Sequence, residues 1–239
     1  MTITSQHNTR LKEIRKLRMR RRWRERSGLF VAEGEDLLAA ADAAGWQAIE
    51  RYCAAGSGLA GIEVEPQLLA SASGLASGTR ALGVYRERFT ELPLGPRCVY
   101  LHGIHDPGNV GAVLRSSEAF EASSVALGKE CADPFGPKAV RASMGAVFSV
   151  PLASAGSPAA LPGVKIALVP GRGTPLWELQ RPAEYTIMIG SERAGLPEEQ
   201  LRQADQVAHI PIHSSSLNAA MAATVALYEL SGRQRAVRP

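Results

Sequence analysis

The sequence contains few cysteines and no long apolar segment. Three cysteines, Cys53, Cys98 and Cys131, occur in 239 residues without C-x-x-C spacing, which argues against a disulfide framework and a zinc site. No run of eighteen apolar residues occurs, so we expect no membrane span. The amino-terminal segment lacks the apolar centre of a secretory signal. Together these absences predict a protein of the reducing cytoplasm.

Two common phosphate-binding fingerprints are also missing. No G-x-G-x-x-G opens a helix, and no G-x-x-x-x-G-K-[ST] is present. The stretch GRGT at 171–174 has two glycines but lacks the rest of either motif. The usual dinucleotide and nucleoside-triphosphate sites therefore lose support. An H-x-x-H pair, His102 and His105, has no further candidate ligands near it, so we expect no metal.

Positive charge is concentrated near the amino terminus. Residues 10–26 hold ten basic side chains and two acidic ones, a local charge of +8 in a chain whose net charge is +4. Leu11, Ile14 and Leu17 recur at helical spacing, which predicts one amphipathic helix. A purely solvated helix face is the alternative, but such a face would repel itself, so we favour contact with a nucleic acid. The candidate phosphate-binding residues are Arg10, Lys12, Arg15, Lys16, Arg18, Arg20, Arg21, Arg22 and Arg24.

The pattern of apolar runs predicts an α/β protein with two domains. Residues 91–96 (ELPLGP) have the composition of a linker, which separates a small α/β domain (1–90) from a larger one (97–239). Short apolar runs alternate with helical segments in the larger part, as expected for strands of a parallel sheet covered on both faces. The predicted strands are 97–103, 123–128, 164–171, 185–190 and 207–212. Ligands bind such sheets beyond the carboxyl ends of the strands.

Three stretches at those ends carry candidate chemistry. In HDPGNVGAVLRSSEAF (105–120), Asn109 can cap the following helix and Arg115 can reach back over the strand ends. In IMIGSERAGLP (187–197), Glu192 follows a glycine that leaves room for a ligand. In HIPIHSSSLNAAMAATVALYEL (209–230), Ser215 or Ser216 can cap the helix, and Asn218 lies one turn inside it. Considered singly, each of these residues has an ordinary structural explanation as a cap or an exposed side chain.

As an ordered set, the three motifs identify a family. DPGNVGAVLRSSEAF, IGSERAGLP and IPI…SLNAAMAATVALYE resemble the three motifs of the SpoU/TrmH class of S-adenosylmethionine-dependent RNA 2′-O-ribose methyltransferases, in the SPOUT superfamily. The stretch NTRLKEIRKL…RSGLFVAEGEDLL resembles the ribosomal-protein-like RNA-binding domain of many members. This resemblance implies a carboxyl-terminal trefoil knot, a homodimer and methyl transfer without a metal, most often to ribosomal RNA.

The resemblance also implies roles for individual residues. The catalytic set would be Asn109, Arg115, Glu192, Ser216 and Asn218, with Asn109 orienting Arg115 or the ribose and Glu192 holding Arg115. The S-adenosylmethionine contacts would be Val169, Pro170, Gly171, Gly190, Ile210 and Leu217. Two departures concern the cofactor contacts: Arg193 replaces a small residue, and only IHSS (212–215) separates Ile-Pro from Ser-Leu-Asn. A transfer-RNA methyltransferase, or an RNA-binding ribosome-assembly protein that has lost catalysis, are the alternatives.

Overall fold

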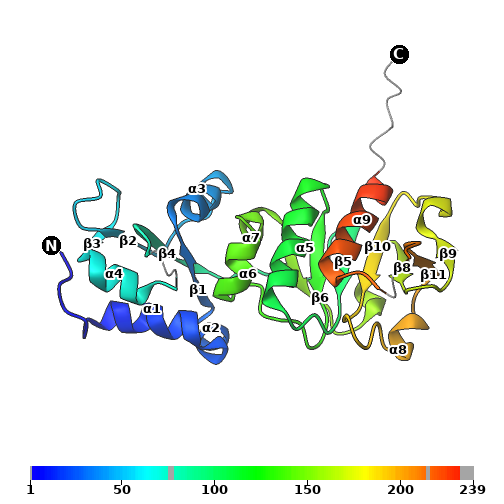
Figure 1. Cartoon of the computed structure of the whole chain (residues 1–239), viewed down its shortest axis with the longest axis horizontal. Coiled ribbons are helices and arrows are strands. Elements are labelled where there is room, and N and C mark those ends of the chain that lie inside the picture. Colours follow the sequence, from blue (N-terminus) through cyan, green and yellow to red (C-terminus); the bar gives the residue numbers. More distant parts are fainter. Residues whose placement is uncertain (1, 75–77, 214–215, 232–239) are drawn as a thin grey trace, which may run out of the picture.

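The strands of the chain form two separate β-sheets (Figure 1). The computed structural model describes residues 2–74, 78–213 and 216–231. A four-stranded sheet has the order β1-β4-β2-β3, and a seven-stranded sheet has the order β7-β6-β5-β10-β8-β11-β9. No described helix has the length and apolar character needed to cross a bilayer.

The smaller sheet belongs to the first part of the chain. Its elements are α1 (Thr9–Met19), α2 (Arg21–Ser27), β1 (Leu29–Glu33), α3 (Glu35–Ala43), β2 (Glu50–Ala54), β3 (Ile62–Val64), α4 (Pro66–Ala72) and β4 (Ala81–Arg86). Leu11, Ile14 and Leu17 are buried against this sheet, as the helical spacing predicts. The prediction of one continuous basic helix is wrong. Arg20 is extended, with φ −127° and ψ 105°, and it divides the basic segment into α1 and α2.

The larger sheet is entirely parallel among its described strands. Its elements are β5 (Arg97–Leu101), α5 (Pro107–Ala119), β6 (Ser124–Leu127), α6 (Pro137–Ala142), α7 (Ala146–Ser149), β7 (Leu152–Ser154), η1 (Pro158–Ala160), β8 (Val164–Leu168), β9 (Thr174–Pro175), η2 (Leu176–Glu178), β10 (Tyr185–Ile189), α8 (Glu198–Leu201), β11 (Gln206–His209) and α9 (Ala219–Ser231). Apolar clusters lie on both faces of this sheet. The predicted α/β class with a covered parallel sheet is confirmed.

A continuous apolar core joins the two sheets. The Phe30 ring of β1 lies 4.7 Å from Phe135 and 5.9 Å from Phe148, measured between centroids. Trp46 precedes β2 and donates from Nε1 to the carbonyl of Phe148 at 2.7 Å. Because the core crosses between the sheets, the division into domains 1–90 and 97–239 stays a prediction.

The predicted linker, residues 91–96, is held against the larger sheet. The N–H of Leu94 donates to Oγ of Ser124 at 2.8 Å, and that hydroxyl donates back to the Leu94 carbonyl at 2.8 Å. Within these residues the chain is therefore fixed rather than a free tether. The trefoil knot also stays a prediction, because the loop that follows β11 includes residues 214–215, which lie outside the described part of the chain.

Candidate functional site

The three motif stretches meet at one edge of the larger sheet. β5, β10, β8 and β11 are neighbours and run parallel, so their carboxyl ends lie side by side. The stretch 105–120 follows β5, the stretch 187–197 includes the end of β10, and the stretch 209–230 follows β11. Their convergence places residues that are far apart in sequence in one site, as the rule for open parallel sheets leads us to expect.

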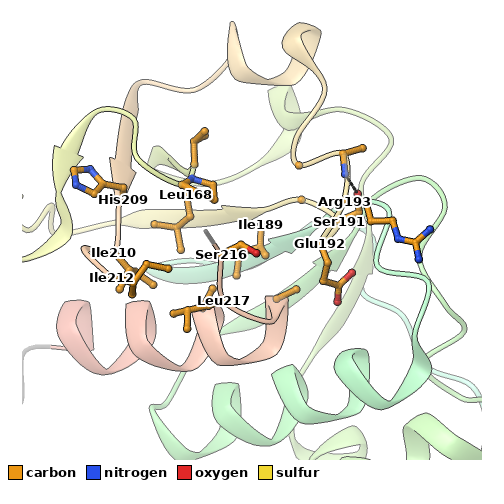
Figure 2. A pocket seen from close by; sticks show the side chains of 17 residues that line it. Leu168, Ile189, Ser191, Glu192, Arg193, His209, Ile210, Ile212, Ser216 and Leu217 are labelled. Atoms are coloured by element: carbon orange, nitrogen blue, oxygen red, sulfur yellow. Dashed lines mark hydrogen bonds between the residues drawn. The ribbon is translucent and has the colours of Figure 1, made fainter. Parts of the chain in front are cut away.

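A cavity of about 300 Å³ lies at this edge, in the size range of small-molecule sites (Figure 2). Its walls are mainly apolar, with Leu168, Ile189, Ile210 and Leu217 directed toward the hollow. The polar lining includes Ser191, Glu192, His209 and Ser216. An apolar cavity with a few polar side chains can enclose a flat heterocycle and orient its polar edges.

Gly190 determines how closely two backbone segments approach beside this cavity. A Cβ added at Gly190 would collide with the backbone of Gly195 and Leu196. The loop therefore folds back over its own start, and only a residue without a side chain fits at that point. The glycine that the sequence singled out has a packing reason for its identity.

A chain of polar side chains connects the three motifs beside the cavity. Nδ2 of Asn109 donates to Oε1 of Glu192, and Nδ2 of Asn218 donates to Oδ1 of Asn109 at 3.0 Å. A carboxylate only accepts hydrogen bonds, so Glu192 fixes which end of the Asn109 amide faces it. The remaining amide oxygen then faces Asn218. The three side chains thus orient one another.

Two predicted helix caps are wrong, and the observed caps leave the Asn109 side chain available for the site. Asp106, not Asn109, caps α5, because its side chain accepts from the N–H of Gly108 at 2.8 Å. Asn109 lies inside the first turn, where its side chain is free of capping and reaches Glu192. Asn218 is itself the cap of α9, since its Oδ1 accepts from the N–H of Ala220 at 2.9 Å. Ser215 lies outside the described residues.

Arg115 does not belong to the cavity of its own chain. Its side chain is exposed on α5, and the residue does not line the cavity. Within the described residues it forms no ion pair and no hydrogen bond, so the expectation that Glu192 holds Arg115 is wrong for a single chain. Glu192 is instead engaged by Asn109.

Most of the residues predicted to contact the cofactor line the cavity. These are Val169, Pro170, Gly190, Ile210 and Leu217. Gly171 does not line it, because the chain turns away after Pro170 through a residue of positive φ, 65°. Leu168, Ile189, His209 and Ile212 also line the cavity and were not predicted. Their position in the sequence, at the ends of β8, β10 and β11, could have identified these four residues. Arg193 lies at the rim, with its guanidinium extended away from the hollow (Figure 2).

Two of the predicted phosphate-binding arginines are structural. Arg24 is 5% exposed, and its Nη2 lies 2.6 Å from Oδ2 of Asp133. Arg18 pairs through Nε with Oε1 of Glu33 at 2.7 Å and donates to the carbonyl of Ala72. Both guanidinium groups already have internal partners, which counts against the prediction that these two arginines bind RNA. The other seven predicted residues are at least partly exposed.

No group of three His, Cys, Asp or Glu side chains in the described ranges is arranged to hold a metal ion. Of the H-x-x-H pair, His102 has its Nδ1 2.8 Å from Nε2 of Gln200. Burial lowers the pKa of His102, because desolvation disfavours the charged imidazolium. His105 is exposed.

Two family descriptions match the chain. Residues 96–228 match the SpoU rRNA Methylase family, and residues 8–92 match the MRM3-like substrate binding domain. The first match covers more than half of the chain, so the chain belongs to the SpoU rRNA methylase family.

Curated and solved proteins are similar to this chain over different lengths. The 23S rRNA (guanosine(2553)-2'-O)-methyltransferase RlmP of Bacillus subtilis is 28% identical over 150 residues, which are 59% of this chain and 60% of that protein. The AdoMet-bound rRNA methyltransferase from Sinorhizobium meliloti aligns over 98% of this chain and 97% of its own, with TM-score 0.87 and 28% identity. AviRb from Streptomyces viridochromogenes, solved with AdoMet, aligns over 94% and 97%, with TM-score 0.82 and 26% identity.

Proposed function

We propose that this protein transfers a methyl group from S-adenosylmethionine to a ribose 2′-hydroxyl of RNA, with ribosomal RNA as the substrate. The observation that carries this proposal is the hydrogen-bonded chain Glu192–Asn109–Asn218, which joins three motifs beside an apolar cavity. Similarity to two AdoMet-bound methyltransferases of nearly equal length supports the choice of cofactor. The name of the Bacillus relative supports a ribosomal substrate.

The cavity fits S-adenosylmethionine. Ile189, Ile210 and Leu217 would supply apolar surface for the adenine, and Gly190 and Gly195 line the same cavity without side chains. Backbone N–H and C=O groups can then form hydrogen bonds with the polar edge of the base. When bound, the sulfonium supplies an activated methyl group, so the protein has to provide alignment and charge stabilisation.

The polar chain would position the ribose. Asn109 and Asn218 are held in fixed orientations, which allows their amides to bind ribose hydroxyls without first reorganising. Ser216 lines the same cavity and would complete the pocket. The 2′-hydroxyl is a weak acid, and a nearby cation would stabilise the negative charge that develops on its oxygen. Arginine stays protonated in proteins, so Arg115 serves as that cation rather than as a base.

Arg115 would act in the pocket of a second subunit, which makes the proposed enzyme a homodimer. Met221, Val225 and Tyr228 form an apolar row on the outside of α9 and are 62%, 39% and 60% exposed. This spacing places them on one helix face. The α9 helix packs against α5, which carries Arg115, so a second copy that covers the row would also lie near the arginine.

The basic amino-terminal segment would bind the RNA, in agreement with its match to a substrate-binding domain. Three buried free thiols, Cys53, Cys98 and Cys131, are compatible with the reducing cytoplasm in which we place the enzyme. The trefoil knot is part of the same proposal, and similarity to the AdoMet-bound structures supports it.

The direct test is methylation by the purified protein. It would be incubated with S-adenosylmethionine labelled in the methyl group and, separately, with deproteinised 23S ribosomal RNA and with transfer RNA. We expect label in the ribosomal RNA, at a nucleotide whose 2′-O-methyl blocks alkaline cleavage. Label in transfer RNA alone would show that transfer RNA, rather than ribosomal RNA, is the substrate. Cofactor binding by calorimetry without any methylation would favour an assembly protein that has lost catalysis.

A further inference from the structure

A hollow at the junction of α1 and α2 collects positive charge. It has a volume of about 500 Å³ and is lined by Arg20, Arg21, Arg22, Trp23 and Arg26. It exists because Arg20 is extended between the two helices, which turns consecutive arginines toward one concave surface. The hollow is separate from the cavity that we assign to methyl transfer, since the two share no lining residue.

The basic residues of this segment fall into two groups. Arg10 lies 3.3 Å from Glu50, and Arg18 and Arg24 pair with Glu33 and Asp133. Such neutralised cations have less charge to offer a polyanion. In the described part of the chain, by contrast, five basic residues have no carboxylate within ion-pair distance: Lys12, Arg15, Arg20, Arg22 and Arg26. Of these five, only Arg20, Arg22 and Arg26 line the hollow.

Two cationic side chains lie over the ring of Trp23. The guanidinium carbon of Arg26 lies 4.0 Å from the indole centroid, and Nζ of Lys16 lies 4.2 Å from it. The indole N–H donates to Glu13. Cation–π contact restricts the Arg26 side chain, so less conformational entropy is lost when it binds an anion. The tryptophan thus preorganises the hollow for an anion instead of stacking on a base.

The hollow is also fixed relative to the larger sheet. Arg21 donates through Nη1 to the carbonyl of Cys131 at 3.3 Å, and Arg24, between the lining residues, is buried against Asp133. α2 lies on the side of the larger sheet where β6 is found, whereas the cavity lies among β10, β8 and β11 (Figure 1). An anion held here would therefore keep a constant position with respect to the site of chemistry.

We propose that this arginine hollow is the main anchor for the phosphate backbone of the RNA, and that the rest of α1 contributes little affinity. The proposal rests on the proposed function and refines it. A guanidinium donates two parallel hydrogen bonds to a phosphate, and three unpaired guanidinium groups around one hollow suit a turn of the backbone with neighbouring phosphates. A lysine-rich or solvated face would have no such concave arrangement.

The test compares two triple variants that lose the same charge. R20Q/R22Q/R26Q removes the unpaired arginines of the hollow, and R10Q/K12Q/R15Q is the matched control on α1. Binding to deproteinised 23S ribosomal RNA would be measured by filter retention over a salt series, without cofactor. We expect the hollow variant to lose at least about tenfold in affinity and the slope of log K against log salt to fall by about two to three, or 0.7–0.9 for each phosphate contact. The control should change by less than about threefold.

Two further measurements keep a negative result interpretable. S-adenosylmethionine affinity should be equal in both variants and the unmodified protein, since neither touches the cavity, and thermal unfolding should show that both variants remain folded at the assay temperature. R20K/R22K/R26K should keep most of the salt slope while losing affinity, because lysine keeps the charge without the fork. Equal losses in the two triple variants would overturn the proposal in favour of diffuse attraction. If polyglutamate competed for the hollow more strongly than RNA, the partner of the hollow would be an acidic protein instead of RNA. Failure of methylation with RNA binding intact would instead count against the proposed function.

Discussion

Asn218 donates from Nδ2 to Oδ1 of Asn109 at 3.0 Å, although 109 residues separate the two asparagines. Asn109 in turn donates to Glu192. Each of the three side chains comes from a different motif, and each follows a different strand of the parallel sheet. The hydrogen bonds therefore connect the three motifs at one point, beside the cavity.

Removing the middle residue of this chain should impair turnover more than folding. In Asn109→Ala, Glu192 and Asn218 lose their common partner, and in Asn109→Asp a second carboxylate faces Glu192. We expect kcat to fall on the order of 100-fold in both, because a misplaced ribose loses its alignment. Single-turnover methylation checks this result.

Asn218→Ala also removes the α9 cap and should lower the free energy of unfolding by about 1 kcal/mol.

The matched control is Asn8→Ala, which removes the cap of α1 far from the cavity. It should lower stability by a similar amount and leave kcat unchanged. If Asn8→Ala and Asn218→Ala reduced turnover alike, the effect would come from stability, and the positioning role of Asn218 would be refuted.

Arg115→Ala should abolish methyl transfer while S-adenosylmethionine binds within a few-fold of its normal affinity, because Arg115 lies outside the cavity of its own chain. Calorimetry and methylation assays separate the two effects. Mixed dimers determine which pocket Arg115 serves. A dimer of one Arg115→Ala chain and one Asn109→Ala chain should recover activity at one site if the arginine acts across the interface. No recovery would place its action within one chain.

The main strands of the larger sheet and the motif loops could be located from sequence because they depend on local pattern. Apolar runs such as 185–190 are buried on both faces wherever they lie in a parallel sheet, and the ligand site follows from the strand direction. The site prediction also benefited from the combination of three motifs, since Asn109 or Asn218 alone has an ordinary explanation as a cap.

Long-range partners could not be predicted in the same way. Arg24 has the same chemistry as Arg22, and only the fold shows that Arg24 meets Asp133, 109 positions away, inside the protein. The break at Arg20 is equally hidden, because arginine is a good helix former and nothing local ends the helix there. The family resemblance implied that Glu192 holds Arg115, whereas in the structure the neutral amide of Asn109 donates to Glu192.

Gly190→Ala should weaken cofactor binding by tenfold or more. The added methyl group would collide with the backbone of Gly195 and Leu196, so the loop that lines the cavity has to move. Titration calorimetry with S-adenosylmethionine measures the change. Gly156→Ala is the control, since a Cβ there meets no atom within 4 Å. Normal affinity in Gly190→Ala would show that this loop does not contact the cofactor.

Glu87 should make stability depend on pH at the contact between the two sheets. Burial, and next the negative charge of Asp133, raise the pKa of Glu87 to about 7, while Arg24 lowers it and Glu25 raises it. The unfolded-state pKa is about 4.5. A raised pKa in the folded state means that the protonated form favours folding. The contribution of Glu87 is therefore complete below pH 4.5 and is lost as the pH rises toward 7.

Glu87→Gln imitates the protonated carboxyl at every pH. The variant should match the unmodified protein at pH 4 and be more stable at pH 8, by about 1 to 3 kcal/mol. Urea unfolding at half-unit intervals of pH measures the difference curve, whose rise should lie between pH 4.5 and 7. Glu91→Gln, at an exposed position in the 91–96 segment, should give a flat curve. A Glu87→Gln curve that is equally flat would show that water or a cation satisfies this carboxylate in solution, and that the contact between the sheets does not sense pH.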